Sequence, residues 1–402
     1  MTLAETPLFG DGYWDKSLEV ADALRAEATV HHATLPNQVR VWVIGQYEHA
    51  RAALVDPRLS KDVGGLTAII RGQLAETGQA DQLSNMFSPH MLFNDDPEHA
   101  RLRGLLAAKF TRARVQSLRP RVEQLTDTLL ETLPRDRPVD LIDRFAFPLP
   151  LTVICELLGI PSTERAPLRD WTAALMEDLP ERTLPASREM ERYFADLIAA
   201  KRADPGDDLL SALIQVADDE DRLTPDELMG TMFLLFVAGH ETSTNMIGNS
   251  VRWLVQDPRR WQLLGREPEL VPAAVQELLR FDSPVRMATH RFTTEPVNYG
   301  GVSIPAGEIV LVSLQSANRD TARFPDGERL DLHRDATGHL AFGHGIHYCL
   351  GASLGRMEAE LALAGLTRRF PQARLAVAET SLRRRPSAIM NGYVDLPLLL
   401  GH

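Results

Sequence analysis

The stretch that decides the fold is Phe342-Gly-His-Gly-Ile-His-Tyr-Cys349-Leu-Gly351, near the C-terminal end of the chain. Its cysteine is one of only two in 402 residues, and a helix-compatible stretch follows it. The glycines around it allow tight turns and a close approach of the backbone to a flat cofactor. The N-terminus of a following helix favours a thiolate over a thiol. The stretch therefore predicts a loop that offers a thiolate to a metal.

Composition narrows the class of protein. The chain is 44% hydrophobic and 24% charged, which is ordinary for a globular protein with a large core. No linker, repeat or low-complexity tract divides it, so we expect a single domain over residues 1–402. Its net charge of -12 argues against nucleic-acid binding, which needs a basic footprint.

The two cysteines and the N-terminal stretch indicate where the protein works. Cys155 and Cys349 cannot make a disulfide framework, which favours a reducing compartment. We expect Cys155 to be an inert core residue, since apolar neighbours surround it. The first residues lack a basic region and a long apolar run, so neither a signal peptide nor a membrane anchor is expected. We therefore expect a cytoplasmic protein.

Hydrophobic spacing predicts a mainly α chain with a minor antiparallel β region on one side. Helices are expected at about 14–28, 46–55, from 95 onward, 115–133, 149–158, 164–176, 186–202, 224–256, 269–281 and 350–369. Strands are expected at 39–44, near 291, and at 297–299, 302–304, 308–314, 373–377 and 393–399. Residues 60–90 are expected to form a loop with a short helix, as a mobile wall over a pocket.

The longest expected helix has an unusual centre. It starts with a strong N-cap signal, Thr224-Pro-Asp-Glu227, and is stopped by Asp257-Pro258. At about 1.5 Å per residue it would extend roughly 48 Å and cross the molecule. Its middle turns abruptly polar at Glu241 and Thr242, which need partners if buried. A bound group beside the helix and a kink in which Thr242 bonds back to the backbone are both open interpretations.

Two charge patterns each have an ordinary and a functional interpretation. Between positions 101 and 121 there is no acidic residue, but there are seven basic ones: Arg101, Arg103, Lys109, Arg112, Arg114, Arg119 and Arg121. They form either a solvated helix face or a docking patch for an acidic partner. Glu277 and Arg280 are three residues apart on a predicted helix, where a surface ion pair is the default.

The cysteine loop can be compared with three kinds of cofactor site. A zinc site could use Cys349 with His333, His339, His344 and His347, although no second cysteine lies nearby and no His-Glu-x-x-His helix occurs. Covalent c-type haem is excluded because Cys-x-x-Cys-His is absent. The Gly343/Gly345 pair is not a dinucleotide fingerprint, since Tyr348 replaces the third glycine that such a motif needs.

The motif Phe342-x-x-Gly345-x-His347-x-Cys349-x-Gly351 resembles, position for position, the haem-binding loop of the cytochrome P-450 family, the haem-thiolate monooxygenases. Ala238-Gly-His-Glu-Thr242 resembles the oxygen-activating segment of that family's long central helix, and Glu277-x-x-Arg280 its buried Glu-Arg pair. The resemblance covers nearly the whole chain and is closest to soluble bacterial members that tailor polyketides and other secondary metabolites. It implies the cytochrome P-450 fold, with the long helix crossing over the haem.

The resemblance also implies roles for particular residues. Cys349 is the axial ligand of a haem b iron, in a loop shaped by Phe342 and Gly345. The haem propionates are bound by His99, Arg103, Arg291 and His347. Glu241 and Thr242 relay protons, and Glu277, Arg280 and Arg334 form a structural triad. The substrate pocket is lined by Leu92, Phe93, Leu234, Val237, Ala238, Val285 and Ala288. Arg286 is either a polar anchor for the substrate or a surface residue.

The expected reaction follows from the same resemblance. It is the hydroxylation or epoxidation of a bulky apolar small molecule, a macrolide, other polyketide or terpenoid, with O2 and two electrons from NAD(P)H. A ferredoxin reductase and a ferredoxin would carry the electrons, the ferredoxin docking near Arg101–Arg121 on a monomeric enzyme. A haem-thiolate peroxygenase or isomerase is the first alternative, although neither needs the Glu241–Thr242 relay. A zinc-binding or sensor protein is the second.

Overall fold

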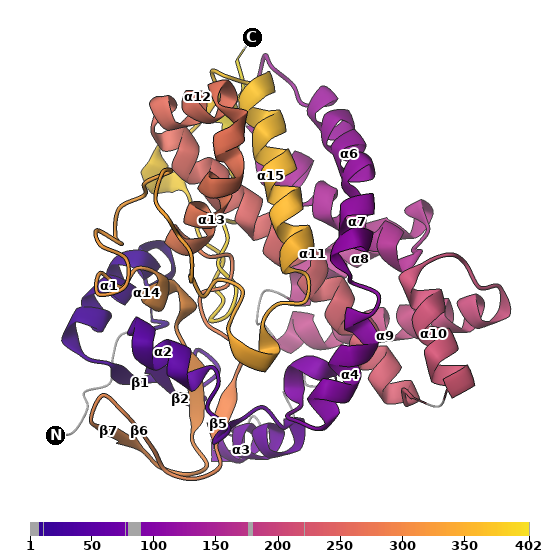
Figure 1. The fold of residues 1–402 in the computed structure, drawn as a ribbon, viewed down its shortest axis with the longest axis vertical. Coiled ribbons are helices and arrows are strands. Elements are labelled where there is room, and N and C mark those ends of the chain that lie inside the picture. The colour runs from indigo at the N-terminus through magenta and orange to yellow at the C-terminus, as the bar shows by residue number, and fades with distance from the viewer. Residues whose placement is uncertain are drawn as a thin grey trace.

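The computed structural model describes residues 8–10, 12–76, 78, 90–175, 180–220 and 222–401. Helices make up most of the molecule, and strands β1, β2, β5, β6 and β7 lie at the lower end of the view in Figure 1, which is also the end nearer the N-terminus. The mainly α fold with small sheets is as the sequence predicts. Across the described ranges, no helix is long and apolar enough to cross a membrane.

The helices are α1 Ser17–Glu27, α2 Tyr47–Ala53, α3 Val63–Glu76, α4 Glu98–Ala107, α5 Arg112–Ser117, α6 Arg119–Glu131, α7 Pro148–Leu158, α8 Arg165–Leu175, α9 Pro180–Ala203, α10 Leu209–Glu220, α11 Pro225–Gln256, α12 Pro258–Arg266, α13 Val271–Phe281, α14 Leu314–Asn318 and α15 Ala352–Arg369. The expected helix at 115–133 is divided at Leu118, because Pro120 starts a new helix. Helices α10, α12 and α14 had no counterpart in the prediction, and α3 is longer than the short helix expected there. Residues 79–89 of the expected loop lie outside the described residues.

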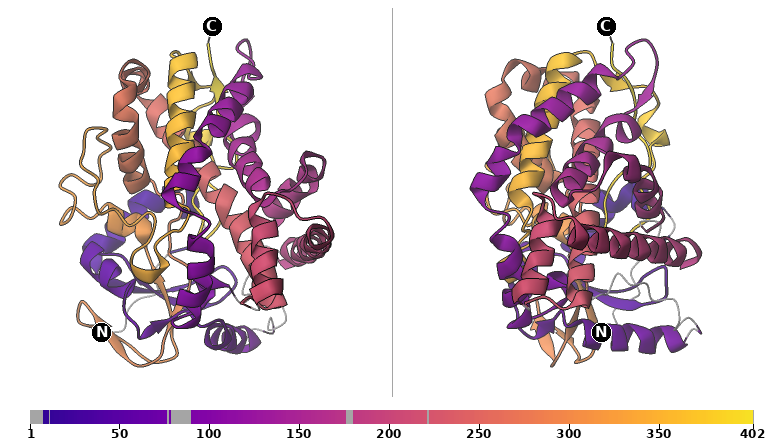
Figure 2. Two further views of the ribbon diagram at one scale, coloured as in Figure 1. Left: turned by 45° about the vertical axis from the view of Figure 1, so that its right-hand side comes forward. Right: turned by 90° about the vertical axis from the view of Figure 1, so that its right-hand side faces the viewer.

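Helix α11 is the central element of the fold. Its start is a capping box: the Thr224 hydroxyl accepts a hydrogen bond from the Glu227 N–H, and the Glu227 carboxylate accepts one from the Thr224 N–H. The helix runs for 32 residues, and most of its side chains are buried. It packs against α7 and α15, and the two views in Figure 2 show it passing through the body of the molecule. A bound group beside α11 would therefore be enclosed by protein.

The main sheet joins distant parts of the chain. Its five strands lie in the order β1-β2-β8-β5-β3, with bounds β1 Val30–Thr34, β2 Arg40–Ile44, β8 Ile309–Val312, β5 Arg291–Thr293 and β3 Leu59–Ser60. The β2–β8 pair is parallel, with Trp42 opposite Val310, whereas the other pairs in the sheet are antiparallel. Strand β3 pairs with β5, so residues near position 60 lie beside residues near position 290.

Two smaller sheets complete the β region. A three-stranded sheet contains β4 Val139–Asp140, β10 Pro397–Leu399 and β9 Arg374–Leu375, and a hairpin joins β6 Val297–Tyr299 to β7 Val302–Ile304. The hairpin turns at Gly300 and Gly301, both with positive φ, as the sequence predicts for this pair of strands. The expected strands at 373–377 and 393–399 are observed, although each is shorter.

Candidate active site

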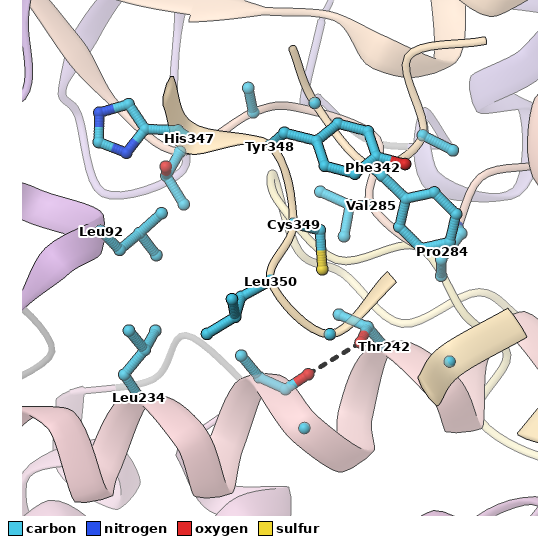
Figure 3. Close-up of a pocket in the computed structure, with 18 of the residues that line it drawn as sticks. Leu92, Leu234, Thr242, Pro284, Val285, Phe342, His347, Tyr348, Cys349 and Leu350 are labelled. Carbon is cyan, nitrogen blue, oxygen red and sulfur yellow. Dashed lines mark hydrogen bonds between the residues drawn. The ribbon is translucent and has the colours of Figure 1, made fainter. Parts of the chain in front are cut away.

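A large cavity lies between α11 and the cysteine loop. It is walled by the loop, by α11, by residues 284–291 and by α4 with the residues before it. Its volume is about 270 Å³, whereas a single water molecule needs roughly 10–15 Å³. Most of its wall is apolar, and Figure 3 shows the Cys349 side chain pointing from the loop toward the α11 helix that carries Thr242. The cavity can therefore hold a large flat group together with a second molecule.

The loop has a shape that glycine makes possible. Gly345 has φ +73°, and a Cβ added to it would lie 2.5 Å from the Val55 Cγ1 atom. The Cys349 N–H donates a hydrogen bond of 2.9 Å to the Phe342 carbonyl, which closes the loop. The next glycine after the cysteine, Gly351, directs its N–H toward the Cys349 sulfur. Positions 345 and 351 thus shape the loop and present the sulfur to the cavity.

The two cysteines lie in different environments. The Cys349 side chain is deep in the protein but open to the cavity. Burial raises the pKa of its thiol, while the Gly351 N–H and the nearby Arg103 and Arg356 oppose that rise. Cys155 is fully buried on α7, and burial raises its thiol pKa to about 12. Only Cys349 is therefore placed to become a thiolate ligand, and the prediction of a buried Cys155 is confirmed.

Cationic and imidazole side chains gather at one part of the cavity wall. They are Lys61, His99, Arg103, Arg291 and His347. Lys61 and Arg291 are only 1% and 4% exposed. Burial lowers the pKa of the Arg291 guanidinium to about 10, and burial together with Arg291 lowers the pKa of Lys61 well below its usual value. Crowded cations with lowered pKa values indicate a site for an anionic ligand.

The two histidines of this group show the same need for an anion. The His99 and His347 rings lie 4.4 Å apart, centre to centre. His99 Nδ1 lies 3.2 Å from Asp96 Oδ1, but its buried Nε2 has no hydrogen-bond partner among the described residues. Burial, with Lys61 and Arg291 nearby, lowers the pKa of His347 to about 2. A dicarboxylate such as the propionate pair of haem would supply the missing partners.

Lys61 is a member of this group that sequence reasoning missed. Its ammonium group donates a hydrogen bond to Thr289 Oγ1 and lies 5.1 Å from the centre of the Phe93 ring. The residue is brought to Arg291 because β3 pairs with β5. A two-residue strand carries too little alternation to be found from sequence, so no signal pointed to this lysine.

The polar centre of α11 is divided between the cavity and the protein interior. Thr242 lines the cavity, and its hydroxyl donates a bond of 2.9 Å to the Ala238 carbonyl, the dashed line in Figure 3. Glu241 is not part of the described cavity wall and is 1% exposed; its Oε1 atom lies 3.9 Å from His240 Nε2. Burial raises the pKa of Glu241. Thr242 therefore fits both open interpretations: its hydroxyl bonds back to the helix backbone, and it lies beside a cavity that could hold a bound group.

The residues expected in the substrate pocket are mostly found in the cavity wall. Leu92, Leu234, Ala238, Val285 and Ala288 line it, whereas Phe93 and Val237 do not. Phe93 is buried against the sheet, and Val237 packs against the core formed by α7 to α10. Figure 3 shows Leu92 and Leu234 on one side of the sulfur and Val285 on the other.

Both expectations for Arg286 are wrong. Its side chain is fully buried, not on the surface, and it does not line the cavity. Its Nη2 donates a 2.9 Å bond to Asn391 Oδ1, and its guanidinium carbon lies 5.3 Å from the centre of the Trp14 ring. It therefore joins the N-terminal and C-terminal segments.

The Glu277–Arg280 pair is a buried network and not a surface ion pair. Both side chains are fully buried, with Arg280 Nε 2.7 Å from Glu277 Oε2. Arg334 Nε lies 3.3 Å from Glu277 Oε1, and Arg280 Nη1 donates to the carbonyls of Asn318 and Gly327. The three side chains therefore fasten the chain that leads into the cysteine loop onto α13.

Most of the basic stretch is engaged in contacts within the protein. Arg101 pairs with Glu227, Arg119 with Glu123 and Glu360, and Arg121 with Glu156. Arg103 Nη2 donates to the Tyr348 carbonyl at 2.7 Å. In the described part of the chain, the side chains of Lys109, Arg112 and Arg114 are exposed and form no ion pair.

The histidines proposed for a zinc site do not form one. His339 Nε2 lies 3.1 Å from Gln276 Oε1, and its Nδ1 accepts a bond from the Ala341 N–H. Within the described ranges, no three His, Cys, Asp or Glu side chains are grouped so that they could hold a metal ion. The zinc interpretation therefore has no ligand set there.

Comparison with known proteins places these features in a family. Residues 266–380 match the sequence model of the cytochrome P-450 family. The chain is 46% identical to cytochrome P-450 107B1 of Saccharopolyspora erythraea over 100% of both chains. It is 42% identical to the 6-deoxyerythronolide B hydroxylase of the same organism, over 89% of this chain and 90% of that one. The tirandamycin C-bound P-450 monooxygenase TamI superposes with a TM-score of 0.91 at 42% identity, covering 97% of this chain and 99% of that structure.

Proposed function

The chain belongs to the cytochrome P-450 family and is a monooxygenase, and from that premise we propose that it hydroxylates or epoxidises a bulky apolar small molecule. One observation carries the proposal: the Cys349 sulfur, the Thr242 hydroxyl and an apolar wall face the same cavity. A macrolide or other polyketide is the favoured substrate class, with a terpenoid as the next choice. A relative named as a hydroxylase of 6-deoxyerythronolide B and a structure with bound tirandamycin C support that choice.

The family uses a haem-thiolate cofactor, which we propose is haem b, and the residues of the cavity fit it. Cys349 would supply the thiolate that binds the iron, from the loop that Phe342 and Gly345 shape. The two propionates would accept bonds from Lys61, His99, Arg103, Arg291 and His347. When bound, the haem iron activates O2, and a thiolate ligand favours cleavage of the O–O bond.

The side chains on the substrate side of the cavity have separate tasks. Leu92, Leu234, Ala238, Val285 and Ala288 would bind and orient the substrate and exclude water. The Thr242 hydroxyl would leave the Ala238 carbonyl and make its hydrogen bond into the cavity instead, where it would hold a proton. Glu241 would resupply that proton, since burial raises the pKa of its carboxyl group and so favours the protonated form.

We propose a ferredoxin and its reductase as electron donors, a monomeric enzyme and a cytoplasmic location. Lys109, Arg112 and Arg114, which are exposed and form no ion pair with any described residue, would contact the acidic ferredoxin. Beside the cysteine, Ile346 and Tyr348 are exposed apolar side chains, 48% and 37% accessible, at the surface of the loop. Exposed apolar side chains together with basic ones are the composition expected of a docking surface for an acidic protein.

A single spectrum tests the proposed function. The reduced, CO-bound protein should show the far red-shifted Soret band of thiolate-ligated haem. Cys349→Ala should abolish that band, and Cys155→Ala should leave it intact. A wild-type protein without the band would refute the proposal. Peroxide-driven turnover that survives Thr242→Ala and needs no ferredoxin would instead support the peroxygenase alternative.

A screen of candidate substrates then identifies the chemical class. Binding in the cavity is expected to shift the spin state of the haem, which absorbance reports directly. Macrolides and other polyketides should produce the shift, and small polar molecules should not. A shift produced only by compounds outside the polyketide and terpenoid classes would contradict the proposed substrate class.

A further inference from the structure

Residues 284–288 form a wall of the cavity that has no regular secondary structure of its own. The segment lies between the end of α13 and the start of β5. Pro284, Val285 and Ala288 line the cavity, and Figure 3 shows the first two on the same side of it. Because neither a helix nor a strand fixes this wall, its position depends on what lies behind it.

Arg286 is at the centre of this wall and points away from the cavity. Its side chain is fully buried and is not part of the described cavity wall. Its N–H donates a bond of 2.8 Å to the Ile389 carbonyl, and its carbonyl accepts one of 3.1 Å from the Gln315 N–H. Its Nη2 donates to Asn391 Oδ1 at 2.9 Å. The backbone and the side chain of Arg286 therefore both fasten the wall to the chain behind it.

Aromatic rings of the N-terminal segment support the charge of Arg286. Its guanidinium carbon lies 5.7 Å from the centre of the Tyr13 ring and 5.3 Å from that of Trp14. Its Nε and Nη1 atoms have no hydrogen-bond partner among the described residues. Burial lowers the pKa of the guanidinium to about 10, so the group is still charged at neutral pH. A buried cation is attracted to aromatic faces more strongly than an exposed one, so the N-terminal segment helps to hold the wall.

Asn391 connects the wall to α11. Its side-chain oxygen accepts the bond from Arg286 and another of 2.6 Å from Arg384 Nη1. Its backbone carbonyl accepts a bond of 2.8 Å from Asn249 Nδ2 on α11. Asn249 follows Thr242 by about two helical turns. Hydrogen bonds on the two sides of one residue thus join the wall to the helix that carries Thr242, and both of these elements line the cavity.

This connection has little freedom to move. Asn391 Nδ2 donates to Asp282 Oδ1 at 2.7 Å, and Arg384 Nη2 lies 2.7 Å from Asp282 Oδ2. A Cβ added to Gly392 would overlap the Asn245 Oδ1 atom of α11, so the chain lies directly on that helix. Buried polar groups that satisfy one another in this way make a rigid support.

We propose that Arg286 is a positioning residue that fixes the distance between the wall at 284–288 and α11, and so selects substrates by the fit of their apolar frame. It touches neither substrate nor cofactor and acts through Val285 and Ala288, which line the cavity. The inference rests on the proposed monooxygenase function and deepens it, because this wall would orient the substrate. A wall that is already in place loses less conformational entropy when a fitting ligand binds.

Two imidazoles of different size test this role whatever the natural substrate is, since each binds haem iron through a ring nitrogen and shifts the Soret band. Imidazole is too small to need the wall, whereas 4-phenylimidazole places a ring in the apolar part of the cavity. Arg286→Met keeps a long side chain but removes the charge and the bond to Asn391. It should weaken the binding of 4-phenylimidazole several-fold and leave that of imidazole almost unchanged. Arg286→Lys, which keeps a cation near the aromatic rings, should restore part of the loss.

Arg319→Met is the matched control. Arg319 is also a buried arginine over an aromatic ring, 4.7 Å from the centre of Phe281, but it pairs with Asp22 of α1 and is not part of the described cavity wall. This variant should lower the stability of the protein and leave the ratio of the two imidazole affinities unchanged. An unaltered ratio in Arg286→Met, or the same change in both variants, would overturn the proposal.

The CO spectrum separates the two possible failures. If the wild-type protein lacks the thiolate band, the proposed function fails and Arg286 has no such substrate to position. If the band is normal in wild type and variants but the affinity ratio is the same in all of them, only the role of Arg286 is refuted. If Arg286→Met does not fold, Asn249→Ala decides the question, because it removes only the bond between α11 and Asn391 and should shift the ratio in the same direction.

Discussion

At the scale of single residues, the cavity contains charges that the protein alone does not neutralise. Lys61 is a fully buried ammonium group whose nearest carboxylate influence, Asp95, is outweighed by burial and by Arg291. Asp95 itself accepts bonds from the Ser60 hydroxyl and the Lys61 N–H. A lysine with a lowered pKa holds its proton less tightly in the folded than in the unfolded protein, so the stability of the cofactor-free protein should increase as pH rises toward the usual lysine pKa.

Replacing Lys61 by Met should therefore have opposite effects on the two forms of the protein. The cofactor-free form should gain roughly 1–4 kcal/mol at neutral pH, because a buried amino group that is costly to desolvate is replaced by an apolar group. The haem-loaded form should release haem faster, because a propionate loses a partner. Thermal unfolding and haem transfer to apomyoglobin measure the two effects. Lys109→Met, at an exposed site, is the control, and equal effects of the two variants would contradict the prediction.

Gly345→Ala should damage the cysteine loop for two separable reasons. The left-handed backbone costs about 1–2 kcal/mol for a residue with a Cβ. The new Cβ would also meet Val55 Cγ1 at 2.5 Å. Gly343→Ala should incur only the first cost, because its nearest neighbour is the His347 carbonyl at 3.6 Å. Denaturation and haem content measure both variants, and adding Val55→Ala should recover part of the loss at 345 but none at 343.

At the scale of elements, α13 holds the segment that leads to the cysteine loop. Glu277 accepts bonds from Arg280 and Arg334 and from the Asp331 N–H, and Arg280 reaches the carbonyls of 318 and 327. One carboxylate therefore fixes a segment that has little regular secondary structure of its own. The network is satisfied only when all of its members are present.

Glu277→Gln should destabilise the protein by about 3–5 kcal/mol, because it leaves two guanidinium groups without their carboxylate in a buried place. Haem content should fall as well, since the loop would lose its support. Urea denaturation gives the stability change. Glu269→Gln, at an exposed position just before α13, should cost almost nothing. A loss of less than 1 kcal/mol for the Glu277 variant would show that the network is not coupled.

Elements with a strong local signal were predictable from sequence, and those set by distant partners were not. The capping box and the Asp257-Pro258 stop located α11 to within a residue or two. The hairpin at Gly300-Gly301 was equally clear. By contrast, β3 has two residues, and only its pairing with β5 makes it a strand. The position of Lys61 in the site was unpredictable for that reason, as was the burial of Arg286 beneath the N-terminal segment.

The cavity residues also divide into those that a local motif predicts and those whose place depends on distant packing. Cys349, His347 and Thr242 belong to compact motifs, so their place could be expected from residues within one loop or one turn. Phe93 and Val237 lie in segments that border the cavity, but their own side chains face away from it. The face that a helical residue presents depends on packing, which the sequence does not show.

At the scale of the whole molecule, charge is distributed unevenly. The net charge is -12, but within the described ranges the side chains of Lys109, Arg112 and Arg114 are exposed and form no ion pair. Helix α5, which carries Arg112 and Arg114, packs against α15, the helix that follows the cysteine loop. An acidic ferredoxin would be steered to this region and repelled by much of the remaining surface. These three basic side chains could therefore be enough to direct the ferredoxin to this region.

Arg112→Gln with Arg114→Gln should raise several-fold the ferredoxin concentration needed for half-maximal reduction. The change should also weaken the dependence of that concentration on salt, because two of the steering charges are gone. The CO spectrum should not change. Arg121→Gln is the control, because that guanidinium is already paired with Glu156 at 2.6 Å. Stopped-flow reduction with ferredoxin measures all of the proteins, and an equal effect at position 121 would contradict the prediction.

The order of strands in the main sheet affects the protein while it is still on the ribosome. Strands β1 and β2 are made early, but β8 and β5, which pair with β2 and β3, follow roughly 250 residues later. At about 5–20 residues per second, the first hairpin waits roughly 12–50 seconds for its partners. During that time β2 offers an open edge with the apolar Val41 and Val43. The early strands of such a nascent chain offer a surface that chaperones can cover, and the cofactor can be taken up only when translation has reached the loop of Cys349.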